Sequence, residues 1–167
     1  ASPVLEGLRK KGFEVLFALD QIDEIALQGV GKFEDFDVID AAKENADLGE
    51  MSDDDKAEAD KAKEELKATM DLVKKVLGTR VDKVAASTRL ETSPSALVQP
   101  QWGVSPQMQR FMRAQAAASG TDDMMMGGMS ANLEINPKHP AVLKLKGMVD
   151  AERDAPATKD FANLLFD

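Results

Sequence analysis

The first 46 residues alternate between apolar and polar segments, and each segment predicts a helix or a strand. Residues 3–12 begin with a proline, place leucines on one face and reach a glycine, which is typical of a short helix. Residues 13–19 are almost entirely apolar, which favours a buried, parallel strand. Residues 22–30 have the pattern of a crossover helix, and residues 36–39 that of a second strand. The pattern predicts a small αβα unit over residues 1–46, at the end of a larger domain because it is small for an independent one.

An acidic, polar stretch follows and predicts a linker that leads into a long helix. Ser52 is suited to be its N-cap, and the three aspartates that follow favour the positive end of a helix. Apolar residues then recur at every third or fourth position until Gly78 ends the pattern. Such a helix has about 25 residues and spans roughly 37 Å. We therefore predict a domain boundary at residue 46 and a second unit over residues 47–167, which a long connecting helix opens.

The second unit has the character of a small sheet packed with helices. Residues 81–87 and 95–99 have the β-branched and small apolar composition of strands, and residues 133–135 add a third before Asn136-Pro137. Three further helices are predicted, from Pro106 onward, over residues 139–152 and over residues 157–167. The apolar pattern of the last helix is still running when the chain stops, which predicts a truncated helix. The fold class predicted for the whole chain is α+β.

Composition limits the classes of partner. The chain has 167 residues, of which 43% are hydrophobic, and it has no stretch of about eighteen apolar residues that would span a membrane. Its 30 acidic and 21 basic residues give a net charge of −9 and are interleaved, which disfavours binding to nucleic acid. The absence of cysteine excludes disulfides and thiolate metal sites and suits a reducing compartment. We therefore predict an intracellular, most simply cytoplasmic, protein.

Candidate catalytic chemistry is sparse. The single histidine, His139, stands beside prolines at a predicted helix start, where a structural role is the better interpretation. Asp20 and Asp23 flank the start of another helix, where carboxylates cap. The acids of residues 47–55 lack the glycine and the terminal glutamate of a calcium loop, and residues 29–31 are too short for a phosphate loop. We predict no catalytic, cofactor-binding or metal-binding residue in this chain.

Binding residues are better supported, because methionines gather in two places. A run of methionines broken by glycines lies between polar flanks, and flexible, polarisable methionine suits a surface that adapts to many partners. The alternatives are a loop without a role and methionines packed against their own sheet. A helical stripe with Phe111 is more often core, and a tryptophan after a strand is often half exposed. The candidate contact residues are Trp102, Met108, Met112, Met124, Met125, Met126 and Met129.

An ordered set of short motifs resembles the heat shock protein 90 family of ATP-dependent chaperones. The set follows the family order over nearly the whole chain, which makes it specific although each piece alone is weak. The matching pieces include Ser2-Pro3, Lys10 to Phe17, Ile22-Asp23-Glu24, Val76-Leu77-Gly78, Val81-Asp82-Lys83-Val84, Arg89-Leu90, Ser93-Pro94 and Leu133 to Pro137. Trp102-Gly103-Val104 departs from the Tyr-Gly-Trp of many relatives, which puts a client role of this tryptophan in doubt.

The resemblance implies what each part of the chain contributes. Residues 1–46 would end the middle domain, and residues 47–167 would form a C-terminal dimerisation domain truncated before its last bundle helices. ATP and magnesium would bind in an N-terminal domain of the parent protein, so this fragment would not be an ATPase. Client proteins, a second protomer of a homodimer and co-chaperones are the implied partners, and a mitochondrial or plastid location is also compatible. The alternative hypothesis is a scaffold that connects domains without contacting clients.

Overall fold

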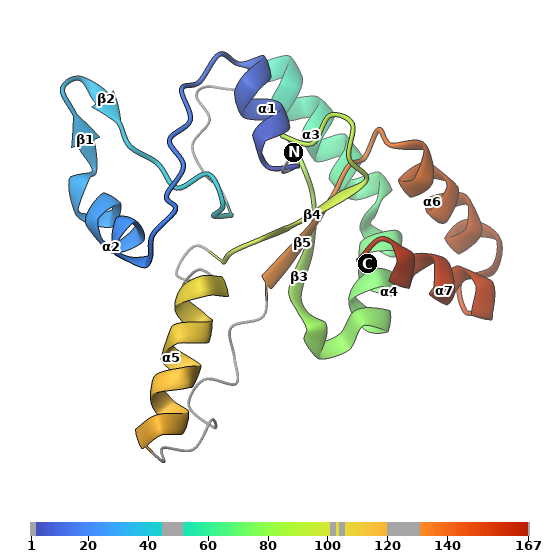
Figure 1. The fold of residues 1–167 in the computed structure, drawn as a ribbon. Coiled ribbons are helices and arrows are strands. Elements are labelled where there is room, and N and C mark those ends of the chain that lie inside the picture. The colour runs from blue at the N-terminus through green and yellow to red at the C-terminus, as the bar shows by residue number, and fades with distance from the viewer. Residues whose placement is uncertain (1–2, 45–51, 101–102, 104–105, 120–130, 167) are drawn as a thin grey trace.

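The computed structural model of the chain describes residues 3–44, 52–100, 103, 106–119 and 131–166. A small sheet lies at the centre, with helices on one side and the N-terminal unit on the other (Figure 1). This arrangement of helices and small sheets confirms the predicted α+β class.

The central sheet has three strands, as the sequence predicts. They are β3 (Val81–Ala86), β4 (Ser95–Val98) and β5 (Ala131–Ile135), in the order β3-β5-β4. The middle strand, β5, runs parallel to β3 and antiparallel to β4, and Leu133 of β5 lies opposite Leu97 of β4. Because the last strand in the sequence lies in the middle, the sheet forms only when residues far apart in the chain meet.

One face of this sheet is covered by three helices and forms the hydrophobic core. The helices are α4 (Lys67–Leu77), α6 (Pro140–Glu152) and α7 (Pro156–Leu164). Leu133 and Ile135 point toward them from the middle strand and are buried. The other main members of the core are Leu66, Leu72, Val73, Leu77, Val81, Val142, Leu145, Val149, Ala162 and Leu165.

The opposite face of the middle strand is polar, because side chains alternate between the faces of a strand. Asn132 and Glu134 are buried there. Glu44 accepts a hydrogen bond from Asn132 Nδ2 at 2.6 Å and pairs with Lys83. The backbone N–H of Glu44 also donates to the carbonyl of Gln99 at 2.7 Å. The N-terminal unit is therefore attached to the sheet through hydrogen bonds and charges.

A buried ion pair lies at the centre of this attachment. The guanidinium of Arg89 binds both carboxylate oxygens of Glu134, at 3.0 and 2.9 Å, and its third nitrogen donates to the carbonyl of Ala41 at 2.8 Å. Ser87 Oγ donates to the same carboxylate at 2.7 Å. Since Arg89 and Glu134 are only 6% and 8% exposed, both charges depend on this network for compensation.

The N-terminal unit contains α1 (Leu5–Lys10), α2 (Gln21–Val30), β1 (Lys32–Phe33) and β2 (Phe36–Asp37). The two short strands pair with each other in antiparallel fashion. Both helices lie where the sequence predicts them, and β2 falls within the second predicted strand. The predicted αβα unit requires a strand between its two helices. The structure instead has a hairpin, β1 and β2, which follows both helices in the chain.

The prediction of a buried parallel strand over residues 13–19 is wrong for this structure. This segment forms no strand, and Leu16, Phe17 and Leu19 are 79%, 66% and 80% exposed. A strand requires a neighbour that accepts its backbone hydrogen bonds. Within the described ranges β1 and β2 pair with each other and provide none, so an apolar run alone does not make a buried strand.

The predicted long helix is also interrupted. It consists of α3 (Asp53–Glu65) and α4, which meet at Leu66. Ser52 Oγ accepts a hydrogen bond from the backbone N–H of Asp55, so the predicted N-cap is confirmed. Leu66 is buried and departs from helical backbone geometry at ψ 0°. The polar residues of α3 leave it without a buried side chain, whereas α4 buries its apolar stripe in the core.

The structure describes the surroundings of His139 but not the predicted domain boundary. The division at residue 46 stays a prediction, because it lies in the undescribed stretch 45–51. His139 is the N-cap of α6, and its Nδ1 accepts a hydrogen bond from the backbone N–H of Ala141 at 3.1 Å. This is the structural role that the neighbouring prolines indicate. No helix in the described ranges is long and apolar enough to cross a membrane.

Candidate functional site

Helix α5 (Pro106–Ser119) carries the part of the predicted contact surface that the structure describes. Alanine, glutamine, methionine and arginine dominate its sequence and are good helix formers, and the proline stands at its first position. In Figure 1 the helix projects away from the end of the sheet. It contains Arg110 and Arg113 and no acidic residue, in a chain whose net charge is −9.

The apolar side chains of α5 are available for contact. Phe111 is 49% exposed and Met112 is 37% exposed, so neither belongs to the core. Met108, one turn before Met112, is partly buried. Residues four positions apart lie on the same side of a helix, which places the two methionines together. The arrangement offers an apolar, flexible surface and no group that could act as an acid, base or nucleophile.

The other candidates lie outside the described residues. They are Trp102, Met124, Met125, Met126 and Met129. Of the seven predicted contact residues, the structure therefore brings together Met108 and Met112. Phe111, which the sequence places in the same stripe, joins them on this helix.

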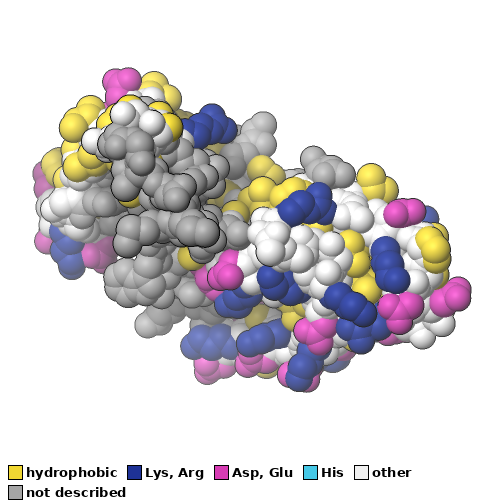
Figure 2. Space-filling view, turned by 90° about the horizontal axis from the view of Figure 1, so that it is seen from below, with side chains coloured by type: hydrophobic (Ala, Val, Ile, Leu, Met, Phe, Trp, Pro, Cys, Tyr) yellow, Lys and Arg dark blue, Asp and Glu magenta, His cyan; other side chains and the backbone are white. Residues whose placement is uncertain are grey.

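A second exposed apolar surface lies on the N-terminal unit, and the sequence interpretation missed it. We call it the N-terminal apolar surface; its members are Leu16, Phe17, Leu19, Ile22, Phe33 and Phe36, all at least 65% exposed. Seen from below, hydrophobic side chains gather at one end of the molecule beside acidic and basic ones, and the other end carries basic and acidic side chains interspersed with hydrophobic ones (Figure 2). For Leu16, Phe17 and Leu19 the available signal was the apolar run of residues 13–19, which the sequence interpretation assigned to a buried strand.

A shallow pocket of about 320 Å³ lies beside the outer strand β4. Leu97, Leu133, Leu164 and Phe166 contribute its apolar wall, and Ser95 contributes a hydroxyl that already donates to the carbonyl of Leu165. None of the described residues that line it is an acid or a base. The pocket can hold an apolar side chain and offers no chemistry for catalysis.

Glu6 is the one group for which the surroundings shift the pKa clearly among the described residues. Its partial burial by itself raises the pKa, but hydrogen bonds from residues 91–93 outweigh this effect and lower the pKa from 4.5 to about 2. These bonds join α1 to the connection between β3 and β4. Glu6 therefore remains charged at all physiological pH values and acts as a permanent hydrogen-bond acceptor.

The lowered pKa predicts an acid-dependent loss of stability. Because the folded pKa lies below the unfolded pKa, Glu6 contributes stability above pH 4.5 that disappears as the pH falls toward 2. We expect Glu6→Gln to cost about 2 kcal/mol at pH 6 and much less at pH 2. Urea unfolding of both proteins between these pH values measures the difference. Glu152→Gln, at an exposed position, is the matched control; an equal and pH-independent cost in both variants would contradict the prediction.

Among the described residues, no group of three or more histidine or acidic side chains is arranged to hold a metal ion. Helix α2 ends with Gly29, Val30 and its C-cap Gly31. These residues do not open a helix, so they cannot present the free N–H groups that bind phosphate at a helix N-terminus.

Comparison with known proteins decides the family. The sequence model of the family described as Hsp90 protein matches residues 1–167. The chain belongs to the Hsp90 family. Among Hsp90 relatives, heat shock protein 90-5, chloroplastic, of Arabidopsis thaliana is 35% identical over 167 residues, which cover 100% of this chain and 21% of that protein.

Two further Hsp90 relatives come from distant organisms. The chaperone protein HtpG of Treponema denticola is 35% identical over 166 residues, covering 99% of this chain and 24% of that protein. Heat shock protein 83 of Leishmania donovani is 36% identical over 167 residues, covering 100% of this chain and 36% of that protein. The chain thus spans about a fifth to a third of these Hsp90 relatives. One of these relatives is named as chloroplastic, and another relative, heat shock protein 90-6 of Arabidopsis thaliana, is named as mitochondrial. The compartment of this chain stays a prediction.

The buried ion pair of this Hsp90 chain also escaped the sequence interpretation, although a signal existed. Glu134 stands between two apolar residues in the predicted third strand, and a buried carboxylate requires a cationic or hydrogen-bonding partner. Arg89 forms part of a family motif in the sequence, but its distance of 45 residues from Glu134 conceals the pairing. Only the folded chain shows that they meet.

Proposed function

We propose that this chain is the part of an Hsp90 chaperone that contacts client proteins, and that α5 carries the contact. The observation that supports this is the exposure of Phe111 and Met112 on a helix that projects from the sheet. Client segments in a partly unfolded state expose apolar side chains, and an adaptable apolar surface binds many such segments without requiring one sequence. Trp102 and the methionines of residues 124–129 extend the proposed surface.

Exposure on α5 makes the proposal testable without disturbing the fold. Substituting an exposed apolar side chain usually changes stability by less than about 0.5 kcal/mol. Burying a phenylalanine or methionine against a client contributes about 1–2 kcal/mol when roughly half its surface is involved. The double variant Phe111→Ser, Met112→Ser removes two such side chains, or about 2–4 kcal/mol, and should therefore bind an unfolding client at least about thirtyfold less tightly. Suppression of the heat-induced aggregation of that client, followed by light scattering, measures the effect.

The matched control for this experiment is Leu143→Ser on α6. Leu143 is 51% exposed, so the control removes a similar exposed apolar side chain from a different helix. Equal loss of suppression in the control and the α5 variant would show that general hydrophobicity, and not α5, captures the client. Full suppression by the α5 variant would remove α5 from the proposal. It would also favour the alternative function, a connector whose methionines have no client role.

The connector alternative has its own supporting observation. The polar attachment of the N-terminal unit, with Arg89, Glu134 and Glu44 at its centre, joins residues 41–44 to the sheet through several hydrogen bonds. Such directional contacts fix the orientation of one unit on the other. A connector needs this rigidity, whereas a client surface does not. The two hypotheses differ in whether α5 contacts clients, and the variant of α5 separates them.

We also propose that the full-length protein is a homodimer, and that its second protomer joins through further helices beyond α7 (Pro156–Leu164). Sedimentation equilibrium of residues 1–167, beside a version extended through those helices, tests the assignment. We expect only the extended protein to dimerise at micromolar concentration. Dimers of residues 1–167 at the same concentration would mean that an exposed surface of this part, such as α5, is itself the protomer contact.

The proposal assigns ATP and magnesium to another part of the full-length protein. The glycines of residues 29–31 do not fit a phosphate, since they close a helix. We therefore expect residues 1–167 to leave ATP intact, and we assign no catalytic step to them.

A further inference from the structure

Residues 91–93, which we call the 91–93 segment, surround the carboxylate of Glu6 with hydrogen-bond donors. The backbone N–H groups of Glu91, Thr92 and Ser93 donate to Glu6 Oε2 at 2.9, 2.8 and 3.2 Å. The hydroxyl groups of Thr92 and Ser93 donate to the other oxygen, Oε1. Five donors from three consecutive residues thus converge on one carboxylate.

The backbone of this segment is held in place from its carbonyl side. The side-chain amide of Asn136, a residue only 1% exposed, donates to the carbonyls of Glu91 and Ser93 at 3.2 and 3.1 Å. The backbone N–H of Asn136 also donates to the carbonyl of Pro94 at 2.8 Å. Because Asn136 directly follows β5, the sheet fixes the segment, and its donors keep their direction without help from Glu6. Preorganised donors of this kind bind an anion with little loss of entropy.

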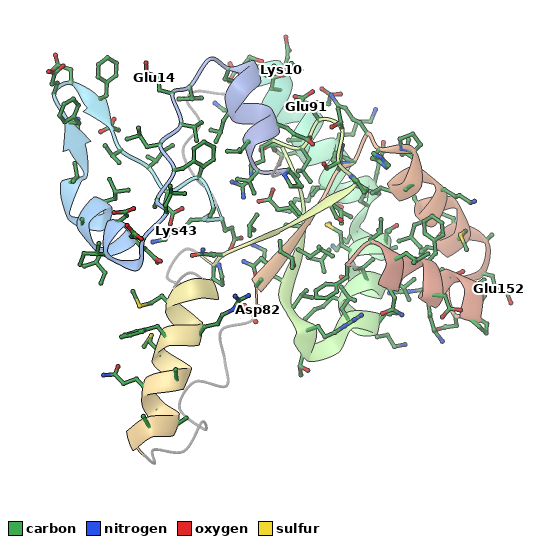
Figure 3. All side chains as sticks on the ribbon, viewed as in Figure 1. Lys10, Glu14, Lys43, Asp82, Glu91 and Glu152 are labelled. Carbon is green, nitrogen blue, oxygen red and sulfur yellow. The ribbon has the colours of Figure 1, made fainter. Side chains whose placement is uncertain are left out.

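The helix that supplies Glu6 is a small element. Helix α1 has six residues, and Leu8 is its buried apolar side chain. A Cβ atom on Gly7 would lie 2.7 Å from the carbonyl oxygen of Arg89, so α1 is packed closely on the connection between β3 and β4. Lys10 adds an exposed ion pair with Glu91 at 2.9 Å, at the upper edge of this contact in Figure 3. A contact of this size can be displaced more readily than the core helices.

We propose that the 91–93 segment is a carboxylate-binding site, which the chain fills with its own Glu6. Three of its five donors are backbone N–H groups, which cannot accept a hydrogen bond or bind a cation. The donors divide between two oxygens of one acceptor, as the two oxygens of a carboxylate require. An acidic side chain of a partner protein competes with Glu6 and releases α1 when other contacts of that partner hold the side chain at a comparably high effective concentration. The proposal rests on these contacts and is independent of client binding by α5.

Acetate, the simplest carboxylate, tests the site when Glu6 is removed. In Glu6→Ala the donors remain, so sodium acetate should shift the amide signals of Glu91, Thr92 and Ser93 in ¹⁵N–¹H correlation spectra until they saturate. At a tenfold excess over the dissociation constant, the melting midpoint of this variant should rise by about 4 °C. Wild type should show neither effect, because Glu6 is tethered at a high effective concentration.

Further variants keep the result interpretable. Adding Ser93→Ala to Glu6→Ala removes one hydroxyl donor and should weaken acetate binding at least threefold. Glu6→Gln keeps a carbonyl acceptor and a side chain of the same size, so it retains a folded protein in which acetate meets a weaker competitor. Matched sodium chloride separates carboxylate binding from ionic strength. Equal shifts in wild type or in chloride would overturn the proposal, as would the absence of saturable shifts at residues 91–93 in both Glu6 variants.

Discussion

Replacing Arg89 with leucine should destabilise the chain by about 3–5 kcal/mol, because it leaves the buried carboxylate of Glu134 without its cation. Arg89 makes two hydrogen bonds to Glu134 and one to the carbonyl of Ala41, and leucine can make none of them. This cost is a large part of the total stability of a typical domain. Urea unfolding followed by circular dichroism should show a much lower midpoint or no cooperative transition.

A second variant separates the unpaired charge from the lost attachment of the N-terminal unit. In Arg89→Leu, Glu134→Leu both charges are gone, so the double variant should be more stable than Arg89→Leu alone. Lys146→Ala, which breaks an exposed pair with Asp150, is the control and should cost no more than about 0.5 kcal/mol. A cost below about 1 kcal/mol for Arg89→Leu would contradict the importance of the buried pair.

The sequence predicted the second unit well, because its elements carry their own periodic signals. The three strands stand out by β-branched composition, and α4, α6 and α7 by caps, prolines and apolar spacing. These signals are local, so they are visible in one dimension. The family motifs then placed the same elements in order, and the fold class followed.

The N-terminal unit was harder to predict because its structure depends on partners. The apolar run of residues 13–19 predicted a strand, yet strand formation requires a neighbour that composition does not specify. Leu66 falls in phase with the apolar stripe of its helix, and the stripe gives no sign of the break at that residue. Local propensity therefore gives the type of an element more reliably than its continuity or its exposure.

The candidate site was partly predictable for a related reason. An apolar stripe with Phe111 and Met112 can be deduced from sequence, but the projection of α5 that leaves it exposed cannot. The Glu6 contact could not be deduced at all, because 85 to 87 residues separate Glu6 from its three backbone donors. Polar contacts between distant segments carry no periodic signal, in contrast to a core face.

The two faces of β5 explain how the chain joins a stable core to a polar attachment. Leu133 and Ile135 belong to the core that the helices cover, whereas Asn132 binds Glu44 of the N-terminal unit and Glu134 binds Arg89, which in turn donates to Ala41, since neighbouring residues of a strand point to opposite faces. The apolar side supplies most of the free energy of folding, and the polar side supplies the orientation of the attached unit. Variants on the two faces should therefore have different consequences.

In the core that holds the apolar face of β5, Leu145→Ala on α6 should cost about 2–5 kcal/mol, because it removes a fully buried side chain and leaves a cavity. Leu145 has no exposed surface and packs in the core between the sheet and the helices. Unlike Arg89→Leu, this variant should loosen α4, α6 and α7 while the hydrogen bonds to residues 41–44 persist until global unfolding. Urea unfolding measures the cost, and hydrogen exchange shows which amides lose protection.

Leu143→Ala provides the matched control from the same helix. Leu143 lies two positions from Leu145 and is 51% exposed, so the same substitution removes the same atoms from a site already in water. We expect a cost within about 0.5 kcal/mol for this variant. If the two substitutions cost the same, α6 would not present Leu145 to the core as described. A large difference between them, with protection lost first in the helices, would show that the core to which α6 contributes Leu145 carries much of the stability of the chain.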